Sequence, residues 1–294
     1  MKVHFAGMEK HDNAVVINKV ADIKYGLFTV FPFICKDFGI GSRSKIGQRV
    51  VNFNDKNFKH CIMDSGLFTL MFGAHAGKRD EKFVKAWQKA IIKFVKDTGY
   101  KGTVVEVDCQ KILGVESAWK LRKELKKALP NNQQMNVFHI EDGKEGLIKL
   151  AKFSDYIALS IPEFRALGWN DIPKKVSQLC RIIKDVKPDI KIHLLGCTQK
   201  NIMERSKFCY SSDSTSWMQV LRWGSQIVFK DGKYQKVKTK TVERNGATFE
   251  KRIEKHFKKE KVTRTSKQIR YYCSMSIAGV YLKQLYTKHA GSQE

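Results

Sequence analysis

The fold class is decided by residues 80–107, DEKFVKAWQKAIIKFVKDTGYKGTVVEV, which join a helical pattern directly to a strand pattern. Between Asp80 and Asp97 apolar residues recur at spacings of three and four, which predicts an amphipathic helix. Thr103–Val107 is short and rich in valine, as is typical of a strand buried on both faces. This order of elements indicates βαβ units in a parallel sheet.

The same alternation runs from the first residue to about residue 216. Strands are expected at Lys2–Ala6, Leu27–Phe33, Cys61–Met63, Thr103–Val107, Met135–Ile140, Tyr156–Ile161, Lys191–Leu195 and Phe208–Ser211. Further helices are expected at Ser117–Leu129, Gly146–Phe153 and Pro173–Val186, whereas the first two connections show no clear helical pattern. Eight strands predict an α/β fold, a closed (β/α)8 TIM-type catalytic barrel over residues 1–216, with a doubly wound open sheet as the alternative. The glycine-rich loops Gly-x-Gly-x-x-Gly and Gly-x-x-x-x-Gly-Lys-Ser/Thr are absent, which disfavours Rossmann and P-loop chemistry.

From residue 217 onward the sequence becomes strongly basic. Gln226–Lys238 predicts a β-hairpin that turns at Asp231-Gly232, and Ile269–Leu285 predicts a helix that packs back on the barrel. Between residues 230 and 270 there are 15 Lys and Arg against 5 Asp and Glu, with aromatic residues interleaved. We therefore predict that residues 217–294 form a basic nucleic-acid-binding extension, with a merely solvated face as the alternative. The predicted contacts are Lys230, Lys233, Lys236, Lys238, Lys240, Arg244, Lys258, Lys259 and Arg264.

The composition of the whole chain supports a polyanionic partner. Its 294 residues include 55 Lys and Arg against 29 Asp and Glu, a formal net charge of +26. Such a surplus is typical of proteins that bind nucleic acid or an acidic membrane surface, although some lysine-rich proteins have no such partner. No run of 18 apolar residues and no signal peptide is present, so we expect no membrane association. The seven widely spaced cysteines predict free thiols in a reducing cytoplasm.

Acidic residues follow several predicted strands directly. Asp64 follows the third strand, Asp108 the fourth, and Asp213 lies just beyond the eighth. Each one alone also suits a helix N-cap, but catalytic groups of a barrel come from the C-terminal ends of its strands. Several carboxylates on one rim therefore predict an active site. Such a cluster suits either Mg²⁺ binding or nucleophilic and acid/base work at a glycosidic carbon.

These residues resemble the motifs of the tRNA-guanine transglycosylases (queuine tRNA-ribosyltransferases). The segment Asp64-Ser-Gly-Leu-Phe68 is similar to the family's Asp-Ser-Gly-Gly-aromatic motif, and Val105-Glu-Val-Asp108 to its strand that ends in a base-recognising Asp. His193-Leu-Leu-Gly196 resembles the family's Tyr-Leu-Met-Gly strand, and Ser212-Asp213-Ser-Thr215 stands where the family keeps its nucleophile. The form of these motifs is closest to the phage-encoded branch, which inserts 7-deazaguanines into DNA.

The resemblance implies a DNA base transglycosylase, a pentosyltransferase that exchanges guanine for a free 7-deazaguanine base. It implies phage DNA modification against restriction, carried out in the host cytoplasm. Asp213 would be the nucleophile that forms a covalent glycosyl intermediate, Asp64 the general acid/base, and Asp108 the acceptor for the purine edge. The base pocket would further include Ser65, Gly66, His139, Ser160 and Gly196.

Two departures from the family bear on the substrate. The chain lacks the Cys-x-Cys-x-x-Cys zinc site of the bacterial tRNA enzymes, and Cys273 and His289 alone cannot supply four ligands. We therefore expect no metal and no cofactor, and DNA rather than tRNA as the substrate. His139-Ile-Glu-Asp-Gly143 also replaces the family's Gln-Gly-Gly. The alternatives are a tRNA-guanine transglycosylase and a non-catalytic nucleic-acid-binding partner subunit.

Other prominent residues have simpler interpretations. His193 lies in an apolar strand and is interpreted as a core or pocket histidine rather than a metal ligand. Cys197 and Cys209 are expected to be inert thiols, and Trp87 and Trp119 to be core residues. Trp217 and Trp223 follow the proposed nucleophile, so they either stack on a base or pack the rim.

Overall fold

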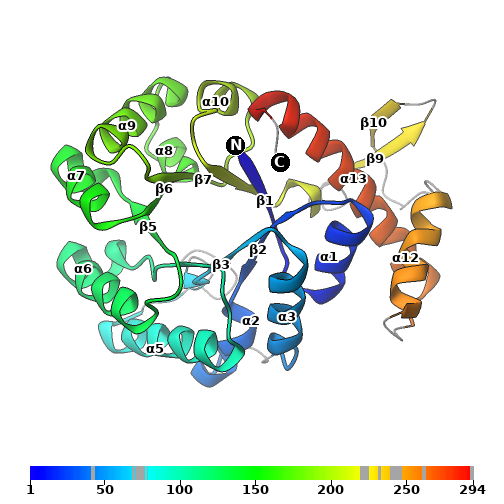
Figure 1. Cartoon of the computed structure of the whole chain (residues 1–294), viewed down its shortest axis with the longest axis horizontal. Helices are drawn as coiled ribbons and strands as arrows, with labels where there is room; N and C mark the ends of the chain where they lie inside the picture. Colours follow the sequence, from blue (N-terminus) through cyan, green and yellow to red (C-terminus); the bar gives the residue numbers. More distant parts are fainter. Residues whose placement is uncertain are drawn as a thin grey trace.

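The computed structural model describes residues 1–40, 44–67, 70, 77, 79–218, 225–230, 233–238, 247–259 and 263–291. Within these residues eight parallel strands pair in chain order, and the eighth pairs with the first to close a barrel (Figure 1). The strands are β1 (Lys2–Ala6), β2 (Tyr25–Thr29), β3 (His60–Asp64), β4 (Thr103–Val105), β5 (Gln134–Phe138), β6 (Tyr156–Ser160), β7 (Lys191–Leu195) and β8 (Ser211–Ser214). The predicted (β/α)8 barrel is thus confirmed, and the open sheet is excluded by the β1–β8 pairing.

Helices surround the barrel (Figure 1). They are α1 (His11–Val15) with the π-helical turn η1 (Val16–Val20), α2 (Phe31–Ile34), the 3₁₀ turn η2 (Cys35–Phe38), α3 (Gly47–Asn57), α5 (Glu81–Thr98), α6 (Gln110–Ala128), the 3₁₀ turn η3 (Ile140–Asp142), α7 (Gly143–Phe153), α8 (Ile161–Ala166), α9 (Ile172–Val186), α10 (Lys200–Arg205), α12 (Ala247–Lys259) and α13 (Ser266–Ala290). No helix in the described ranges is long and apolar enough to cross a bilayer.

The α5 region shows how the sequence builds the barrel wall. Asp80 caps the helix by accepting a hydrogen bond from the Phe83 N–H at 2.7 Å, and Gly99 ends it in the left-handed conformation (φ 66°). The apolar positions, among them Trp87 and Ile91, are buried against the strands. Trp87 and Trp119 are therefore core residues, as predicted.

Several predicted strand limits are wrong. The second strand ends at Thr29 because Pro32 lies in the first turn of α2, where its fixed φ favours a helix. The fourth and fifth strands end two residues early, at Val105 and Phe138. The structure also places helices in the first two connections.

The predicted eighth strand, Phe208–Ser211, is wrong by three residues, because β8 spans Ser211–Ser214. Phe208 lies outside the strand and is 51% exposed. The strand itself consists of Ser, Ser, Asp and Ser, which carry no apolar pattern. Two of its serines are held by hydrogen bonds instead: Ser211 to Nδ1 of His193 at 2.6 Å inside the barrel, and Ser214 to the Tyr286 hydroxyl of α13 at 3.3 Å.

The C-terminal region supplies both a hairpin and the last helix of the ring. Strands β9 (Ser225–Lys230) and β10 (Lys233–Lys238) pair antiparallel, which confirms the predicted hairpin, although its turn at 231–232 lies outside the described residues. Helix α13 contacts α10, η1 and β9 and lies between α10 and α1 in the ring (Figure 1). Along the chain, the hairpin and α12 therefore come between β8 and α13, the helix that completes the ring after β8. The start of α13 is tied to α1, since Asp12 accepts hydrogen bonds from Arg264 and from the Tyr272 hydroxyl, each at 2.8 Å.

All seven cysteines lie in the described part of the chain and are buried thiols rather than disulfides. Burial raises the pKa of Cys197 to about 11. Cys209 lies 3.6 Å from the sulfur of Cys180, and this contact together with burial holds its pKa well above the ordinary value. Thiols in this state are poor nucleophiles, so their burial agrees with the prediction that both are inert.

A buried ion pair joins the residue that follows β4 to α6 and β5. The Glu106 carboxylate accepts hydrogen bonds from Arg122 (2.5 and 2.7 Å), from the Asn136 amide (2.6 Å) and from the Val137 N–H (2.9 Å). Because both charged side chains are buried, each one depends on the other for compensation of its charge.

We expect Arg122→Met to lower the free energy of unfolding by about 3–5 kcal/mol, because it leaves the Glu106 carboxylate buried without its counter-ion. Urea denaturation followed by circular dichroism measures this change. The control is Lys120→Met, which removes an exposed partner of Glu116 on the same helix and should leave the midpoint unchanged. Equal midpoints for Arg122→Met and the wild type would contradict the role of the pair.

Candidate active site

A pocket of about 640 Å³ opens at the C-terminal ends of the strands. This is the end of a barrel where active sites lie, and the volume is in the range of small-molecule sites. Of the predicted site residues, the structure brings together in its lining Asp64, Ser65, Asp108, His139, Ser160, Gly196 and Asp213. The strand-end aspartates therefore converge on one cavity. Gly66 is not in the lining, but it shapes the turn that presents Asp64.

The turn after β3 holds Asp64 in place. The Gly66 N–H donates a hydrogen bond to Asp64 Oδ2 at 3.0 Å, and the Trp87 indole donates one to the Ser65 carbonyl at 2.9 Å. Gly66 has a φ of +72°, and a Cβ there would lie 2.8 Å from Cβ of Phe31. Both the conformation and the space thus require glycine, which gives the Asp-Ser-Gly order a structural reason.

The environment of Asp64 favours its protonated form. Burial raises the pKa of this carboxyl to about 6, and the negative charge of Asp213 adds to the rise, whereas the hydrogen bond from Gly66 opposes it. A carboxyl with a pKa near the working pH can both give and take a proton. When two neighbouring carboxyl groups have different pKa values, one can serve as an acid while the other stays ionised.

Hydrogen-bond contacts hold one oxygen of the Asp213 carboxylate. Its Oδ1 accepts a hydrogen bond from the Gly196 N–H at 2.7 Å and lies 3.2 Å from Nε2 of His193. Gly196 has a φ of +58°, and a Cβ there would lie 3.0 Å from Cγ of Pro162, so glycine is favoured at this position too. Within the described residues both hydrogen bonds to this carboxylate involve Oδ1, which leaves Oδ2 for a ligand in the pocket.

Asp108 is paired with a histidine. Its Oδ1 lies 2.6 Å from Nε2 of His139, whose Nδ1 lies 3.3 Å from Oε1 of Glu163. Burial alone would lower the pKa of His139, but its hydrogen bonds to Asp108 and Glu163 and their charges raise it to about 10. Both ring N–H groups are then engaged by carboxylates, so His139 orients Asp108 rather than donating to a bound base.

Glu163 belongs to the same group of charges. Lys111 contacts Glu163 Oε1 at 2.6 Å, and these contacts lower the pKa of Glu163 against the effect of burial. Ser160 accepts a hydrogen bond from the Glu163 N–H at 3.3 Å and so caps α8 as well as lining the pocket. Lys111 and Arg165 also line the pocket and place positive charge there.

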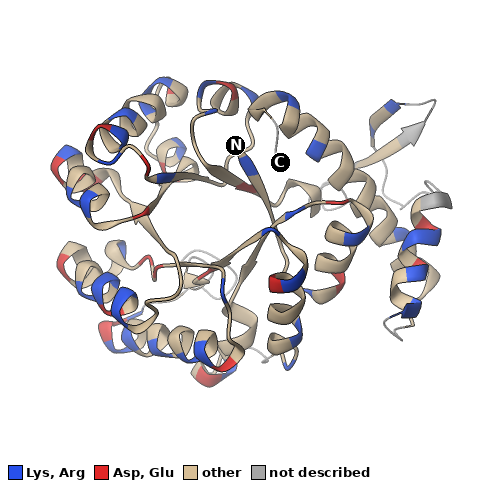
Figure 2. Ribbon diagram, viewed as in Figure 1, with Lys and Arg blue, Asp and Glu red and all other residues tan. Residues whose placement is uncertain are grey.

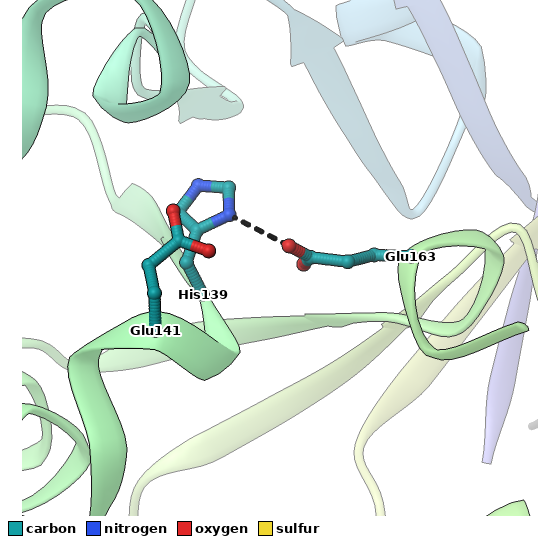
Figure 3. Close-up of side chains that lie close together, drawn as sticks. All are labelled: His139, Glu141 and Glu163. Atoms are coloured by element: carbon teal, nitrogen blue, oxygen red, sulfur yellow. Dashed lines mark hydrogen bonds and ion pairs between the residues drawn. The ribbon is translucent and has the colours of Figure 1, made fainter. Parts of the chain in front are cut away.

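His139, Glu141 and Glu163 offer ligand atoms within 4.8 Å of one another, and Figure 3 shows the carboxylate of Glu163 directed at the imidazole. A metal ion would have to displace the proton that His139 shares with Asp108 and Glu163, and Lys111 is already paired with Glu163. The arrangement is therefore explained as an ion-pair network that fixes Asp108.

Three histidines lie in the barrel interior: His4 and His193 in the middle of β1 and β7, and His60 at the start of β3. His4 and His193 are fully buried; His4 Nε2 lies 2.8 Å from His60 Nδ1, and His60 Nε2 lies 2.8 Å from the Thr103 hydroxyl. Burial holds the pKa of His4 well below its ordinary value and lowers that of His60 to about 4. His193 is a buried, hydrogen-bonded histidine as predicted, but its contact with Asp213 was not foreseen. The sequence hint is a histidine inside strands β1, β3 and β7, whose inward-facing positions fill a barrel.

Of the predicted nucleic-acid contacts whose side chains are described, none is in the pocket lining. Lys233, Lys236, Lys258 and Lys259 are exposed, whereas Arg264 is bound to Asp12. Strand residues Lys230 and Lys238 have no described side chains, and Lys240 and Arg244 lie outside the described residues. Figure 2 shows that Lys and Arg are also spread over the outer faces of α5, α6, α7 and α9, so the positive charge is not confined to the C-terminal region.

Trp217 packs the rim. It is 1% exposed, and its indole N–H donates a hydrogen bond to the Ala6 carbonyl at 2.8 Å. Of the two alternatives for this residue, stacking on a base is therefore excluded. Trp223 lies outside the described residues.

The fold and the site define a (β/α)8 barrel with three aspartates in the pocket at its C-terminal face. No protein-family model and no curated protein matches the chain. Among solved structures it is similar to an aldolase, QR15, at 12% identity and a TM-score of 0.44, over 73% of this chain and 89% of that one. It is also similar to a GH10 endoxylanase retrieved from a sugarcane soil metagenome, at 9% identity and a TM-score of 0.43, over 66% of this chain and 68% of that one.

We expect Asp64→Asn to become more stable relative to the wild type as the pH rises. A carboxyl whose folded pKa is raised from 3.8 to about 6 binds its proton more tightly in the folded state, so the wild type loses stability as the pH rises through this window. The asparagine does not ionise. Urea denaturation at pH 4 and pH 7 should show the difference shifting by about 1–3 kcal/mol in favour of the variant.

The control for this measurement is Asp97→Asn, which changes an exposed carboxylate paired with Lys93. Its difference from the wild type should show no comparable gain between the two pH values. A pH-independent difference for Asp64→Asn would contradict the raised pKa.

His139 should remain an imidazolium at pH 8. Because its folded pKa is about 10 against an ordinary 6.5, its ion pairs stabilise the fold fully below pH 6.5 and are lost as the pH rises through 10. Nitrogen-15 NMR of labelled histidine, assigned by the loss of one resonance in His139→Gln, should show both ring nitrogens protonated at pH 8. Half-titration near pH 6.5 would show that the network with Asp108 and Glu163 does not form.

Proposed function

We propose that this protein is a DNA base transglycosylase that exchanges guanine for a free 7-deazaguanine through a covalent bond between Asp213 and the sugar. The observation that carries the proposal is the pairing of two unlike carboxylates in one pocket. Asp213 has one oxygen fixed by hydrogen bonds and the other available, whereas Asp64 has a raised pKa. A nucleophile and a proton carrier are the two groups that a retaining exchange at an anomeric carbon requires.

In the first step Oδ2 of Asp213 attacks C1′ of the target nucleotide. The bond from C1′ to N9 of guanine breaks, its electron pair goes to the base, and protonated Asp64 supplies the proton that the leaving guanine takes up. The product is a glycosyl ester on Asp213 and an ionised Asp64.

In the second step N9 of the incoming base attacks C1′. Asp64 accepts the proton from N9, and the ester bond breaks to restore the Asp213 carboxylate. Two inversions at C1′ give net retention, and Asp64 ends in the protonated state in which it began. No oxidant, reductant or further reactant is needed.

Asp108 is suited to hold the base. One of its oxygens is paired with protonated His139, and the carboxylate retains lone pairs for the N1–H and amino groups of a guanine-type edge. A base in a duplex reaches such a pocket only after it is flipped out of its stack.

The charge of the protein supports a nucleic acid as the substrate. Lys111 and Arg165 line the pocket, where they would meet the phosphates that flank a flipped nucleotide, and the net charge is +26. The exposed lysines of β10 and α12 would extend this contact along the backbone of the nucleic acid. DNA is favoured over tRNA by the missing cysteine motif.

We expect Asp213→Asn to reduce base exchange by about a thousandfold or more, because an amide cannot form the glycosyl ester. The assay measures the entry of labelled guanine or a 7-deazaguanine into duplex DNA and, in parallel, into a tRNA pool. Binding of DNA should survive in the variant. The control is Asp185→Asn, an exposed residue of α9, which should be fully active.

The outcomes of this assay separate the alternatives. Label in tRNA alone would make the protein a tRNA-guanine transglycosylase. Binding without exchange in the wild type would favour a non-catalytic binding subunit. Exchange by Asp213→Asn at the wild-type rate would contradict the proposed nucleophile.

A further inference from the structure

A chain of buried polar groups leads from the barrel wall to Asp213. The Tyr156 hydroxyl contacts the Ser211 hydroxyl, which lies 2.6 Å from Nδ1 of His193; Nε2 of His193 lies 3.2 Å from Oδ1 of Asp213. Tyr156, His193 and Ser211 come from the adjacent strands β6, β7 and β8 and are fully buried. Since buried polar groups are costly unless each is paired, this chain is a specific feature of the barrel interior.

We propose that His193 is a positioning residue for the nucleophile: a neutral imidazole whose Nε2–H, set by the Tyr156–Ser211 pair behind it, fixes Oδ1 of Asp213 and leaves Oδ2 to attack. This proposal rests on the proposed function for the role of Asp213. The hydrogen-bond chain itself stands on the geometry alone.

The direction of the chain follows from the chemistry of its members. An ionised carboxylate only accepts, so Nε2 of His193 must carry the hydrogen that Asp213 receives. In a neutral ring Nδ1 is then an acceptor, and Ser211 donates to it. Ser211 in turn accepts from Tyr156, which remains a donor because burial raises its pKa well above the ordinary value. Each of the three donor hydrogens, on Tyr156, Ser211 and His193, therefore has one acceptor.

Most of the groups that face His193 are uncharged. Besides Asp213 and Ser211 on β8 and Tyr156 on β6, it faces His4 on β1, with ring centroids 6.0 Å apart. His60 on β3 lies behind His4, and burial keeps both of these imidazoles uncharged. Of the groups named here only Asp213 is acidic, and it is already bound by the Gly196 N–H.

Ser211, His193 and Asp213 also have the order of a hydrolase triad, but they cannot act as one. Ser211 is fully buried and is not in the lining of the pocket, so no substrate reaches its hydroxyl. Asp213, at the far end of the chain, is the member that lines the pocket. The chain therefore acts on the carboxylate and not on the serine.

Two donors, from Gly196 and His193, thus converge on one oxygen of Asp213. They stop the carboxylate from rotating, which keeps Oδ2 in one attack geometry. The same two donors would stabilise the negative charge that returns to the Asp213 carboxylate when the incoming base breaks its ester bond to the sugar. Both effects act on the reacting state rather than on substrate binding, so loss of His193 should lower kcat and leave KM nearly unchanged.

The kinetic test compares His193→Phe, His193→Gln and Ser211→Ala, each checked for folding by circular dichroism. We expect His193→Phe to lower kcat about a hundredfold with KM within about twofold of the wild type. His193→Gln, whose amide can donate to Asp213, should recover about tenfold of that loss. Ser211→Ala should lower kcat by about tenfold, because the ring loses the partner that sets its tautomer. The control His60→Gln alters an interior histidine that does not touch Asp213 and should keep kcat within about twofold.

A second measurement does not depend on activity. Nitrogen-15 NMR at pH 7 should show His193 as a neutral ring with the proton on Nε2, assigned by comparison with His193→Gln, and Ser211→Ala should shift it toward a mixture of tautomers. A ring protonated on Nδ1, or an imidazolium, would overturn the hydrogen-bond chain. If the wild type exchanges bases and folded His193→Phe keeps its kcat, the positioning role is overturned. If the wild type exchanges no base at all, the proposed function fails, and the NMR result still decides the chain.

Discussion

The pairing of β8 with β1 is the contact on which the site depends. It runs in register from Lys2 opposite Ser211 to Phe5 opposite Ser214, closes the barrel, and brings the last strand back to the first. Asp213 thereby enters the pocket that Asp64 and Asp108 reach from β3 and β4. Because β8 has no apolar side chains, its place is secured by hydrogen bonds, inward from Ser211 and outward from Ser214 to α13.

Buried polar and charged groups in the site lower the stability of the fold, and contacts outside the site compensate for this loss. Burial of Asp64 close to Asp213 disfavours its charge, and the interior histidines replace apolar packing with polar contacts. The raised pKa of Asp64 and the hydrogen bonds that hold one oxygen of Asp213 suit the two roles proposed for them. The compensating contacts lie farther out, in the hydrogen-bonded Glu106–Arg122 pair and in the apolar clusters between strands and helices.

The sequence predicts the barrel well, because parallel strands buried on both faces leave apolar runs between amphipathic helices. It also predicts that Asp64, Asp108 and Asp213 converge, since the strand ends of a barrel meet on one face. It fails at β8, where hydrogen bonds take the place of the apolar pattern. It could not show that His139 pairs with Asp108, or that His193 contacts Asp213, because the pattern of residues does not give the direction and reach of side chains across neighbouring strands.

The most direct measurement of the central claim is mass spectrometry of the protein after denaturation during turnover. The protein would be mixed with a short guanine-containing DNA duplex, quenched in acid and digested. We expect a peptide containing Asp213 that carries the mass of the base-free oligonucleotide, and no such adduct without DNA. Base exchange without an adduct, or an adduct on a peptide that does not contain Asp213, would contradict the proposed nucleophile.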